Sequence, residues 1–255
     1  KKINNELAGI SAEYAICQIF ELDGQEDILN RVDEEFIRQF HEYTTIFTPL
    51  IEEAMSSMPE IVKYVGLGRG KGQEKSPIDF MTNDKQSISI KTNIKGDKQC
   101  PSRCGQAGSS TFDKFFGHLY PSNFNGKINF QRFEQLFREQ FHQMLPIYLE
   151  NLFDCNYMLW IFKQRNNWKY RIIQREAIPT NYNWNIQNFT FSHTNRDWLS
   201  SGEISSTVRF YGNTGHNYKI GRAPNSLGEF QVHSNRAGYK FRLCMSKYLR
   251  MFGLL

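Results

Sequence analysis

The chain has 255 residues, of which 40% are hydrophobic, and a formal net charge of +5 at pH 7. That length suffices for one large domain or two small ones with a substantial core. No apolar run reaches the roughly 18 residues of a membrane span, and the first twenty residues do not resemble a signal peptide. The chain has five cysteines, an odd number for a disulfide scaffold. We therefore expect a cytoplasmic protein with no membrane partner.

The charge is distributed unevenly along the chain. Residues 1–62 hold 4 Lys/Arg and 13 Asp/Glu, a net charge of −9, whereas the rest of the chain holds 27 and 13, a net charge of +14. Residues 207–250 contain eight basic residues and one acidic residue, Glu229. A long one-sided basic surface is typical of proteins that bind a polyanion, although basic strands that bind RNA or a membrane surface would have the same composition.

Three helices are predicted before residue 60. Residues 5–20 place apolar side chains at helical spacing, and residues 27–43 and 48–57 form two further helical stretches, the second beginning at Thr48-Pro49. A basic, glycine-rich stretch follows at residues 66–72. It is either a linker or a loop that closes on phosphate groups through its backbone N–H groups.

Two short strands come next. Residues 78–81 and 88–91 are separated by a polar turn, which is the pattern of a hairpin. Asp79 precedes Lys91 by twelve residues, and Ser89 and Lys91 project from the same face of their strand because they lie two residues apart. One carboxylate beside one ammonium group suits metal-assisted attack on a phosphodiester. The carboxylate holds Mg²⁺ against a phosphate oxygen, and the lysine stabilises charge or orients the attacking water.

The middle of the chain predicts a long helix and a second hairpin. Residues 129–153 carry an aromatic stripe at helical spacing, with Pro146 as the expected kink. Residues 157–162 are nearly all apolar and suit a strand buried on both faces, and residues 168–173 alternate and are expected to pair with them. This alternation of helices and hairpins favours an α/β core sheet.

From about residue 200 the chain is rich in Gly, Ser and Asn and predicts strands at 204–211, 230–234 and 239–244. The polar side chains of this region are of the types that hydrogen-bond base edges in the major groove. The candidates for DNA contact are Arg209, Asn213, His216, Arg222, Gln231, His233, Asn235 and Arg236. The alternative is a twisted antiparallel sheet whose exposed face is simply polar.

Pro77-Ile78-Asp79 followed by Ser89-Ile90-Lys91 resembles the PD-(D/E)XK core of type II restriction endonucleases. Ile78 separates the proline from the aspartate, and Ser89 stands where that pattern has its second acidic residue. The resemblance implies an α/β fold, with a restriction-endonuclease-like core in which helices flank a mixed central sheet. We expect this catalytic core over residues 1–200 and a β-rich C-terminal DNA-recognition region over residues 201–255, integrated into the same domain.

The resemblance also implies the roles of the site residues. Asp79 is the expected Mg²⁺ ligand and Lys91 the residue that positions or polarises the attacking water, whereas Ser89 brings no charge. Glu13 on the first helix, where family members often carry a glutamate, and Glu74 just before the hairpin are the two candidates for the missing charge. Candidates for contact with the phosphates that flank the scissile bond are Thr92, Asn93, Lys95 and Gln106.

The residues and the resemblance together predict a Mg²⁺-dependent type II restriction endonuclease that hydrolyses phosphodiester bonds at specific sites in double-stranded DNA. It is expected to act as a monomer or homodimer, alongside a cognate DNA methyltransferase of the same restriction–modification system. Two other classes remain open. One is a non-catalytic nucleic-acid-binding protein on a decayed nuclease fold, and the other is a structure-specific repair or recombination nuclease.

Overall fold

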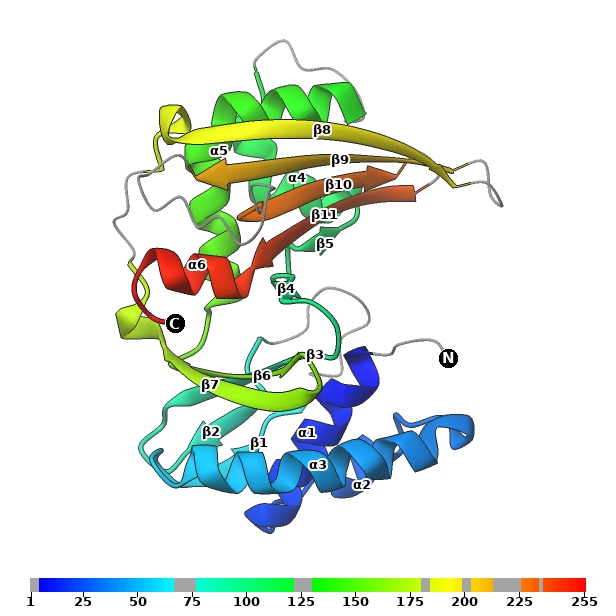
Figure 1. Ribbon diagram of the computed structural model, residues 1–255, viewed down its shortest axis with the longest axis vertical. Helices are drawn as coiled ribbons and strands as arrows, with labels where there is room; N and C mark the ends of the chain where they lie inside the picture. The colour runs from blue at the N-terminus through cyan, green and yellow to red at the C-terminus, as the bar shows by residue number, and fades with distance from the viewer. Residues whose placement is uncertain are drawn as a thin grey trace. The chain divides into compact units, whose positions relative to one another are not determined.

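A computed structural model describes residues 5–66, 77–121, 130–179, 184–198, 203–212, 226–233 and 236–255. The described residues form two compact units. The first unit comprises those within residues 1–70, 75–97 and 153–178, and the second those within residues 98–152 and 179–255. Each unit combines helices with a sheet, so the chain has the mixed α/β fold that was expected, consistent with a restriction-endonuclease-like fold (Figure 1).

The two units are interleaved in the sequence. The chain passes from one unit to the other near residues 97, 152 and 178. The boundary expected near residue 200 coincides with none of these points, and a division of function between residues 1–200 and 201–255 stays a prediction.

The first unit is built on a five-stranded sheet in the order β1-β2-β3-β6-β7. Its strands are β1 (Ile61–Tyr64), β2 (Phe80–Thr82), β3 (Ser87–Asn93), β6 (Tyr157–Gln164) and β7 (Asn167–Gln174). Both predicted hairpins, β2–β3 and β6–β7, are confirmed as antiparallel pairs, while β3 and β6 run parallel. A parallel pair needs a crossover connection, which here is the whole stretch between residues 93 and 157.

Helices α1 (Asn5–Ile19) and α3 (Ile37–Met55) pack together in the first unit. The short α2 (Gln25–Leu29) and a 3₁₀ turn (Glu34–Phe36) lie between them in the sequence. The prediction of separate helices at 27–43 and 48–57 was wrong, because α3 runs through Pro49. A buried stripe continues on both sides of the proline, and its members are Phe40, Thr44, Phe47, Ile51, Ala54 and Met55. We infer that packing of this stripe outweighs the one backbone hydrogen bond that proline removes.

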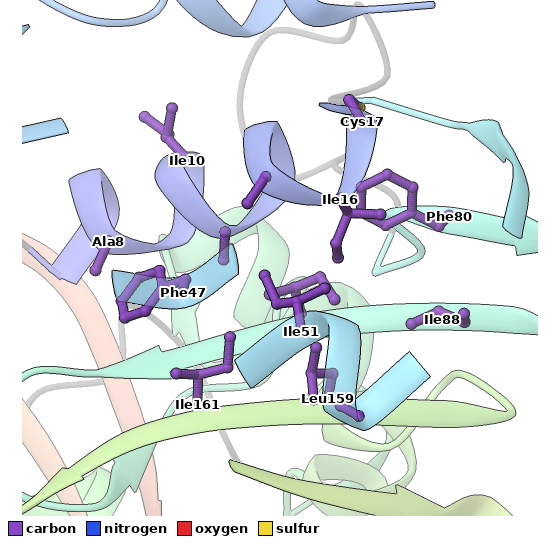
Figure 2. Packing of buried hydrophobic residues seen from close by; sticks show 14 of the residues in the cluster. Ala8, Ile10, Ile16, Cys17, Phe47, Ile51, Phe80, Ile88, Leu159 and Ile161 are labelled. Atoms are coloured by element: carbon purple, nitrogen blue, oxygen red, sulfur yellow. The ribbon is translucent and has the colours of Figure 1, made fainter. Parts of the chain in front are cut away.

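The core of the first unit lies between these helices and the sheet. Figure 2 shows Ile16 of α1 and Phe47 and Ile51 of α3 close to side chains of the strands. The strands contribute fully buried residues on one face, among them Ile88 and Leu159. This packing fixes the positions of β2 and β3 with respect to α1.

The second unit contains a six-stranded sheet, with β4, β11, β10, β9 and β8 in that order and β5 paired to β11. The strands are β4 (Lys98–Gln99), β5 (Gln106–Ala107), β8 (Phe189–Trp198), β9 (Glu203–Gly212), β10 (Gly228–His233) and β11 (Arg236–Cys244). The strands predicted at 204–211, 230–234 and 239–244 are confirmed as β9, β10 and β11. Helices α4 (Ser109–Phe116), α5 (Phe130–Leu152) and α6 (Met245–Met251) complete the unit, with 3₁₀ turns at Gly117–Leu119 and Ile186–Asn188.

Alternation along the strands gives this second sheet one apolar and one polar face. The apolar face packs on α5, where the ring centroids of Phe137 and Phe230 lie 3.5 Å apart and those of Tyr148 and Phe241 lie 4.2 Å apart. The helix runs through Pro146, and its non-helical residue is Gln140, so the kink expected at Pro146 lies at Gln140 instead. The part of the aromatic stripe whose side chains are described, from Phe137 onward, is buried in the core.

Candidate active site

Asp79 lies in the central part of the first sheet, just before β2. Its backbone N–H donates to Ile88 O at 2.8 Å, and its carbonyl accepts from Val65 N–H at 2.9 Å. Its side-chain Oδ2 accepts hydrogen bonds from the backbone N–H of Ile90 at 2.6 Å and from Ser89 Oγ at 3.3 Å. The predicted hairpin therefore brings the Asp79 carboxylate onto the strand that carries Ser89 and Lys91.

The environment of Asp79 favours its protonated form. Burial is the largest cause and the charge of Glu13 the second, and together they raise the pKa of Asp79 from 3.8 to about 7. The Lys91 ammonium and the hydrogen bonds from Ile90 and Ser89 oppose this shift. Glu13 and Lys91 therefore each lie close enough to Asp79 for their charges to act on its carboxyl group.

Glu13 projects from α1 and has two partners from other elements. Arg31 follows α2 in the chain, and its Nη1 donates to Glu13 Oε2 at 2.7 Å. The hydroxyl of Tyr64 on β1 donates to the same oxygen at 2.9 Å. Arg31 also donates to the Tyr64 oxygen at 3.2 Å. Burial and the Glu13 charge hold the pKa of Tyr64 well above its usual range, so the phenol keeps the proton that it donates.

Sequence reasoning missed three residues of this neighbourhood. Arg31 and Tyr64 bind Glu13 across 18 and 51 positions of the chain. The buried thiol of Cys155 interacts electrostatically with both Lys91 and Asp79, and burial raises its pKa to about 12. No local pattern could have found Arg31 or Tyr64, whereas Cys155 was visible only as a cysteine next to an apolar strand.

The carboxylates of this neighbourhood are compatible with a divalent cation. Within the described ranges no group of three or more His, Cys, Asp or Glu residues is arranged as a metal site. The charge of Glu13 raises the cost of ionising Asp79, and a cation between the two carboxylates would relieve it. Mg²⁺ is commonly bound by one or two carboxylates, with water and substrate phosphate as the remaining ligands. Glu74 lies outside the described residues, so its contribution stays a prediction.

The residues that follow Lys91 occupy different environments. Thr92 Oγ1 donates to Asn5 O at 3.1 Å, and the buried Asn93 accepts a hydrogen bond from Trp160 Nε1 at 2.8 Å. Both side chains therefore have partners within the first unit. Lys95 is exposed in the turn after β3. Gln106 is exposed on β5 in the second unit, and its Nε2 contacts Cys100 Sγ at 3.7 Å. Phosphate contact by these four residues stays a prediction.

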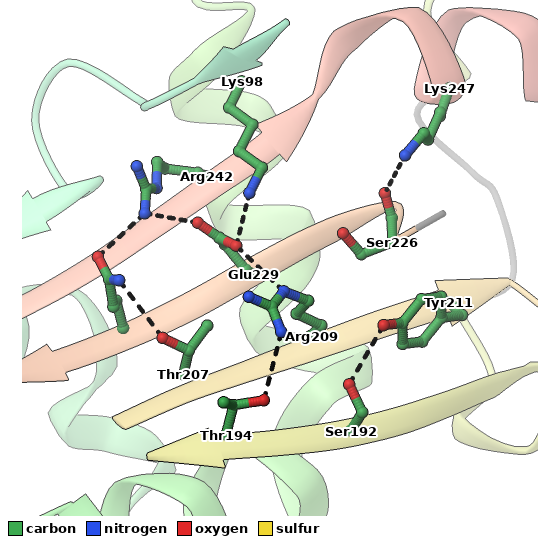
Figure 3. Close-up of polar contacts among 11 residues, drawn as sticks. Lys98, Ser192, Thr194, Thr207, Arg209, Tyr211, Ser226, Glu229, Arg242 and Lys247 are labelled. Atoms are coloured by element: carbon green, nitrogen blue, oxygen red, sulfur yellow. Dashed lines mark hydrogen bonds and ion pairs between the residues drawn. The ribbon is translucent and has the colours of Figure 1, made fainter. Parts of the chain in front are cut away.

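The candidates for DNA contact in the second unit fall into two sets. Arg209, Gln231 and His233 lie on β9 and β10, where Arg209 and Gln231 take part in a polar network (Figure 3). Arg236 begins β11, and its side chain is not among those described. The residues Asn213, His216, Arg222 and Asn235 lie outside the described part of the chain, as do residues 67–72 of the glycine-rich stretch.

The fold and the neighbourhood of Asp79 point to the class of enzymes that hydrolyse phosphodiesters. The mixed first sheet carries the buried Asp79 carboxylate and Lys91, and helix α1 packed on that sheet brings a second carboxylate, Glu13, close to Asp79, which is a set of groups suited to this reaction. In the described part of the chain, none of the helices has the length and apolar character needed to cross a bilayer.

Comparison with known proteins supports the same class. No protein-family model matches the chain. The chain is 26% identical over 175 residues to "Type II restriction enzyme CviAII" of Paramecium bursaria Chlorella virus 1. The match covers 68% of this chain and 44% of the viral protein, so the chain spans less than half the length of that relative. This distant, partial similarity supports a restriction-endonuclease-like function.

Proposed function

We propose that the protein is a Mg²⁺-dependent endonuclease of the type II restriction class, with a PD-(D/E)XK site in which Ser89 replaces the second acidic residue. The observation that carries this proposal is the convergence of Asp79, Glu13 and Lys91 in the first unit. The similarity to a type II restriction enzyme supports it independently of the geometry.

The proposed roles follow from the contacts of each residue. Asp79 and Glu13 would hold Mg²⁺, which polarises a phosphate oxygen and lowers the pKa of a bound water when it is present. Lys91 orients the attacking water or stabilises the developing negative charge. Ser89 and the Ile90 N–H fix the orientation of Asp79, and Arg31 and Tyr64 fix that of Glu13.

The proposed substrate is double-stranded DNA, cut at a defined sequence. A protein of this kind endangers the DNA of its own host unless the site is modified. We therefore infer that a cognate DNA methyltransferase acts in the same system. The enzyme works as a monomer or as a homodimer, and a two-fold symmetric target would favour the dimer.

Plasmid cleavage in the presence of Mg²⁺ tests the proposed roles. We expect Asp79→Ala and Lys91→Ala each to abolish cleavage, because each removes a group that acts on the reacting phosphate. The Asp79 variant should still bind duplex DNA. Ser89→Ala should lose less activity than Asp79→Ala, since the serine carries no charge into the site.

Two controls match these variants in chemistry. Asp84→Ala and Lys169→Ala remove one acidic and one basic side chain from exposed positions of the same unit, and both should cleave like the wild type. Retained cutting by the Asp79 or Lys91 variant would exclude the mechanism. Wild-type protein that binds DNA and never nicks it would indicate a decayed nuclease, and preference for branched DNA would indicate a structure-specific enzyme.

A further inference from the structure

The polar face of the second sheet carries a buried carboxylate surrounded by three basic side chains. Glu229 on β10 is 3% exposed, and its carboxylate oxygens lie 2.7 Å from Lys98 Nζ, 2.5 Å from Arg242 Nη2 and 3.6 Å from Arg209 Nε. Figure 3 shows the three cations reaching Glu229 from different strands. We call these four residues the Glu229 cluster.

Strand register explains why the cluster forms. Glu229 is the direct cross-strand partner of Arg242 on β11 and of Arg209 on β9. Side chains of directly opposite residues lie on the same face of a sheet, at a separation that allows ion pairs. Lys98 arrives from β4, which pairs with β11 on its other edge. The carboxylate is therefore fixed between cations from three neighbouring strands.

Further hydrogen bonds hold the two arginines in place. Arg242 Nη2 donates to Gln231 Oε1 at 3.0 Å, and Gln231 Nε2 donates to Thr207 Oγ1 at 3.3 Å. Arg209 Nη1 donates to Thr194 Oγ1 at 3.3 Å. Side chains held in this way lose little conformational entropy when they bind a ligand. The arrangement is therefore preorganised.

The cluster carries more positive charge than the Glu229 carboxylate neutralises. Three cations and one carboxylate leave a formal surplus of two positive charges. The pKa of Glu229 is lowered: burial raises it, but the hydrogen bond from Lys98 and the charges of Arg242, Lys98 and Arg209 outweigh burial, which keeps the carboxylate ionised. The side chains of Lys98, Arg209 and Arg242 keep about a third of their surface exposed. Each arginine also has five N–H donors, more than its contacts in the cluster use.

We propose that the Glu229 cluster binds the backbone phosphates of duplex DNA, with Lys98, Arg209 and Arg242 as the phosphate ligands and Glu229 as the residue that positions them. This rests on the proposed function. The occupant follows from charge complementarity, because duplex DNA presents one negative charge for about every 1.7 Å of its axis and the cluster offers adjacent cations across three strands. Phosphate contacts of this kind position a protein on DNA without reading its sequence.

The dependence of DNA affinity on salt tests the proposal. Binding of the full chain to a fluorescent duplex of arbitrary sequence is measured without Mg²⁺, between about 50 and 200 mM salt, where each phosphate contact contributes about 0.9 to the slope of log affinity against log salt. We expect the double variant Arg209→Gln/Arg242→Gln to lower that slope by about 2 and to weaken binding at least about tenfold, the typical effect of losing one charge-assisted hydrogen bond.

Two further variants distinguish loss of the cluster from a change in net charge and from misfolding as the cause of weaker binding. Lys114→Gln removes one charge from α4, a helix whose Phe112 packs on Tyr239 of the opposite, apolar face, and it should bind like the wild type. Glu229→Gln/Arg242→Gln leaves the net charge of the chain unchanged and leaves no buried carboxylate with a partner missing. It should still weaken binding, because one phosphate ligand and the positioning carboxylate are gone.

The outcomes distinguish this proposal from the proposed function. Wild-type affinity and slope in both cluster variants would overturn it and make the cluster a structural ion network, even if the wild type cleaves plasmid DNA. Loss of duplex binding in both cluster variants, with Lys114→Gln unaffected, supports it. That result would hold for a wild type that never cuts DNA, in which case only the catalytic proposal fails.

Discussion

Asp79 illustrates how burial and a like charge tune one carboxyl group. In the unfolded chain its pKa has the ordinary value of 3.8, and in the folded chain burial and Glu13 raise it to about 7. Between these values the folded state binds more protons than the unfolded state. The free energy of unfolding therefore falls as pH rises from 3.8 to about 7. Above this range Asp79 is ionised in the folded state as well, and the loss of stability is complete.

This linkage predicts the behaviour of Asp79→Asn. The amide cannot ionise, so in metal-free buffer the variant should gain stability relative to the wild type as pH rises from below 3.8 to above 7. The gain is on the order of a few kcal/mol, since one pKa unit corresponds to about 1.4 kcal/mol. Thermal unfolding at a series of pH values measures it. Asp84→Asn, in the exposed turn after β2, is the control, and an equal pH dependence in both variants would contradict the account.

Gly24 supports the site indirectly through Tyr64. It has a φ of 108°, and a Cβ at this position would lie 2.3 Å from Cδ1 of the Tyr64 ring. Gly24→Ala should therefore displace the ring that holds Glu13, with a loss of stability of about 1–3 kcal/mol and reduced DNA cleavage. Thermal unfolding and plasmid cleavage measure the two effects.

Gly96 is the matched control for Gly24. It has a φ of 74°, but nothing lies within 4 Å of the point that a Cβ would occupy there. Gly96→Ala thus introduces the same kind of backbone strain without a steric clash, and it should leave cleavage close to the wild-type level. Equal loss of cleavage in the two variants would show that Tyr64 does not matter for the site.

At the scale of helices and strands, sequence patterns predicted the elements whose contacts lie close together in the chain. The β2–β3 hairpin was predictable because its two strands and its turn lie within 14 residues, and the β6–β7 hairpin was predictable because its strands and turn lie within 18. The hairpin was enough to bring Asp79 near Ser89. The partners of Glu13 were not predictable, because Arg31 and Tyr64 reach it only through tertiary packing.

Helix α3 and strand β8 differed from prediction for packing reasons. Helix α3 passes through Pro49 because its buried stripe extends on both sides of the proline. Strand β8 was missed because its sequence, Phe189–Trp198, mixes aromatic and polar residues without a strong turn before it, and its pairing with β9 over ten positions stabilises it.

Helix α5 carries a prediction about stability. The Phe141 ring lies within 5.4 Å of Phe189, Phe191 and Phe210, measured between ring centroids. Phe141→Ala should therefore destabilise the protein by about 3–5 kcal/mol, the usual cost of a large cavity. Gln135→Ala, at an exposed position of the same helix, should change stability little. Chemical denaturation monitored by circular dichroism measures both, and similar midpoints would contradict the assignment of the stripe to the core.

At the scale of the whole molecule, the interleaved sequence of the two units has a consequence for truncation. A fragment of residues 1–200 keeps α5 but lacks β9, β10 and β11, whose aromatic side chains pack on that helix. It should expose the aromatic stripe and aggregate, or lose residues 98–200 to limited proteolysis. A monomeric fragment that unfolds cooperatively and resists protease throughout would show that the second sheet is not needed to cover α5.

The charge pattern read from the sequence also has a structural counterpart. The basic stretch between residues 207 and 250 includes Arg209 and Arg242, which the sheet brings together with Lys98 around Glu229. Composition predicted an anion-binding surface, but it could not predict that the lone acidic residue of this stretch lies at the centre of the cations. That arrangement depends on strand register, which composition does not contain.

Cleavage at a defined DNA sequence by the Asp79 site is tested by sequencing the ends of the fragments that the protein releases from a plasmid of known sequence. We expect ends at one fixed sequence, produced in Mg²⁺ by the wild type and absent from digests with Asp79→Ala or Lys91→Ala prepared in parallel. Ends scattered over the plasmid, or the same ends in the variant digests, would exclude site-specific cleavage by this site.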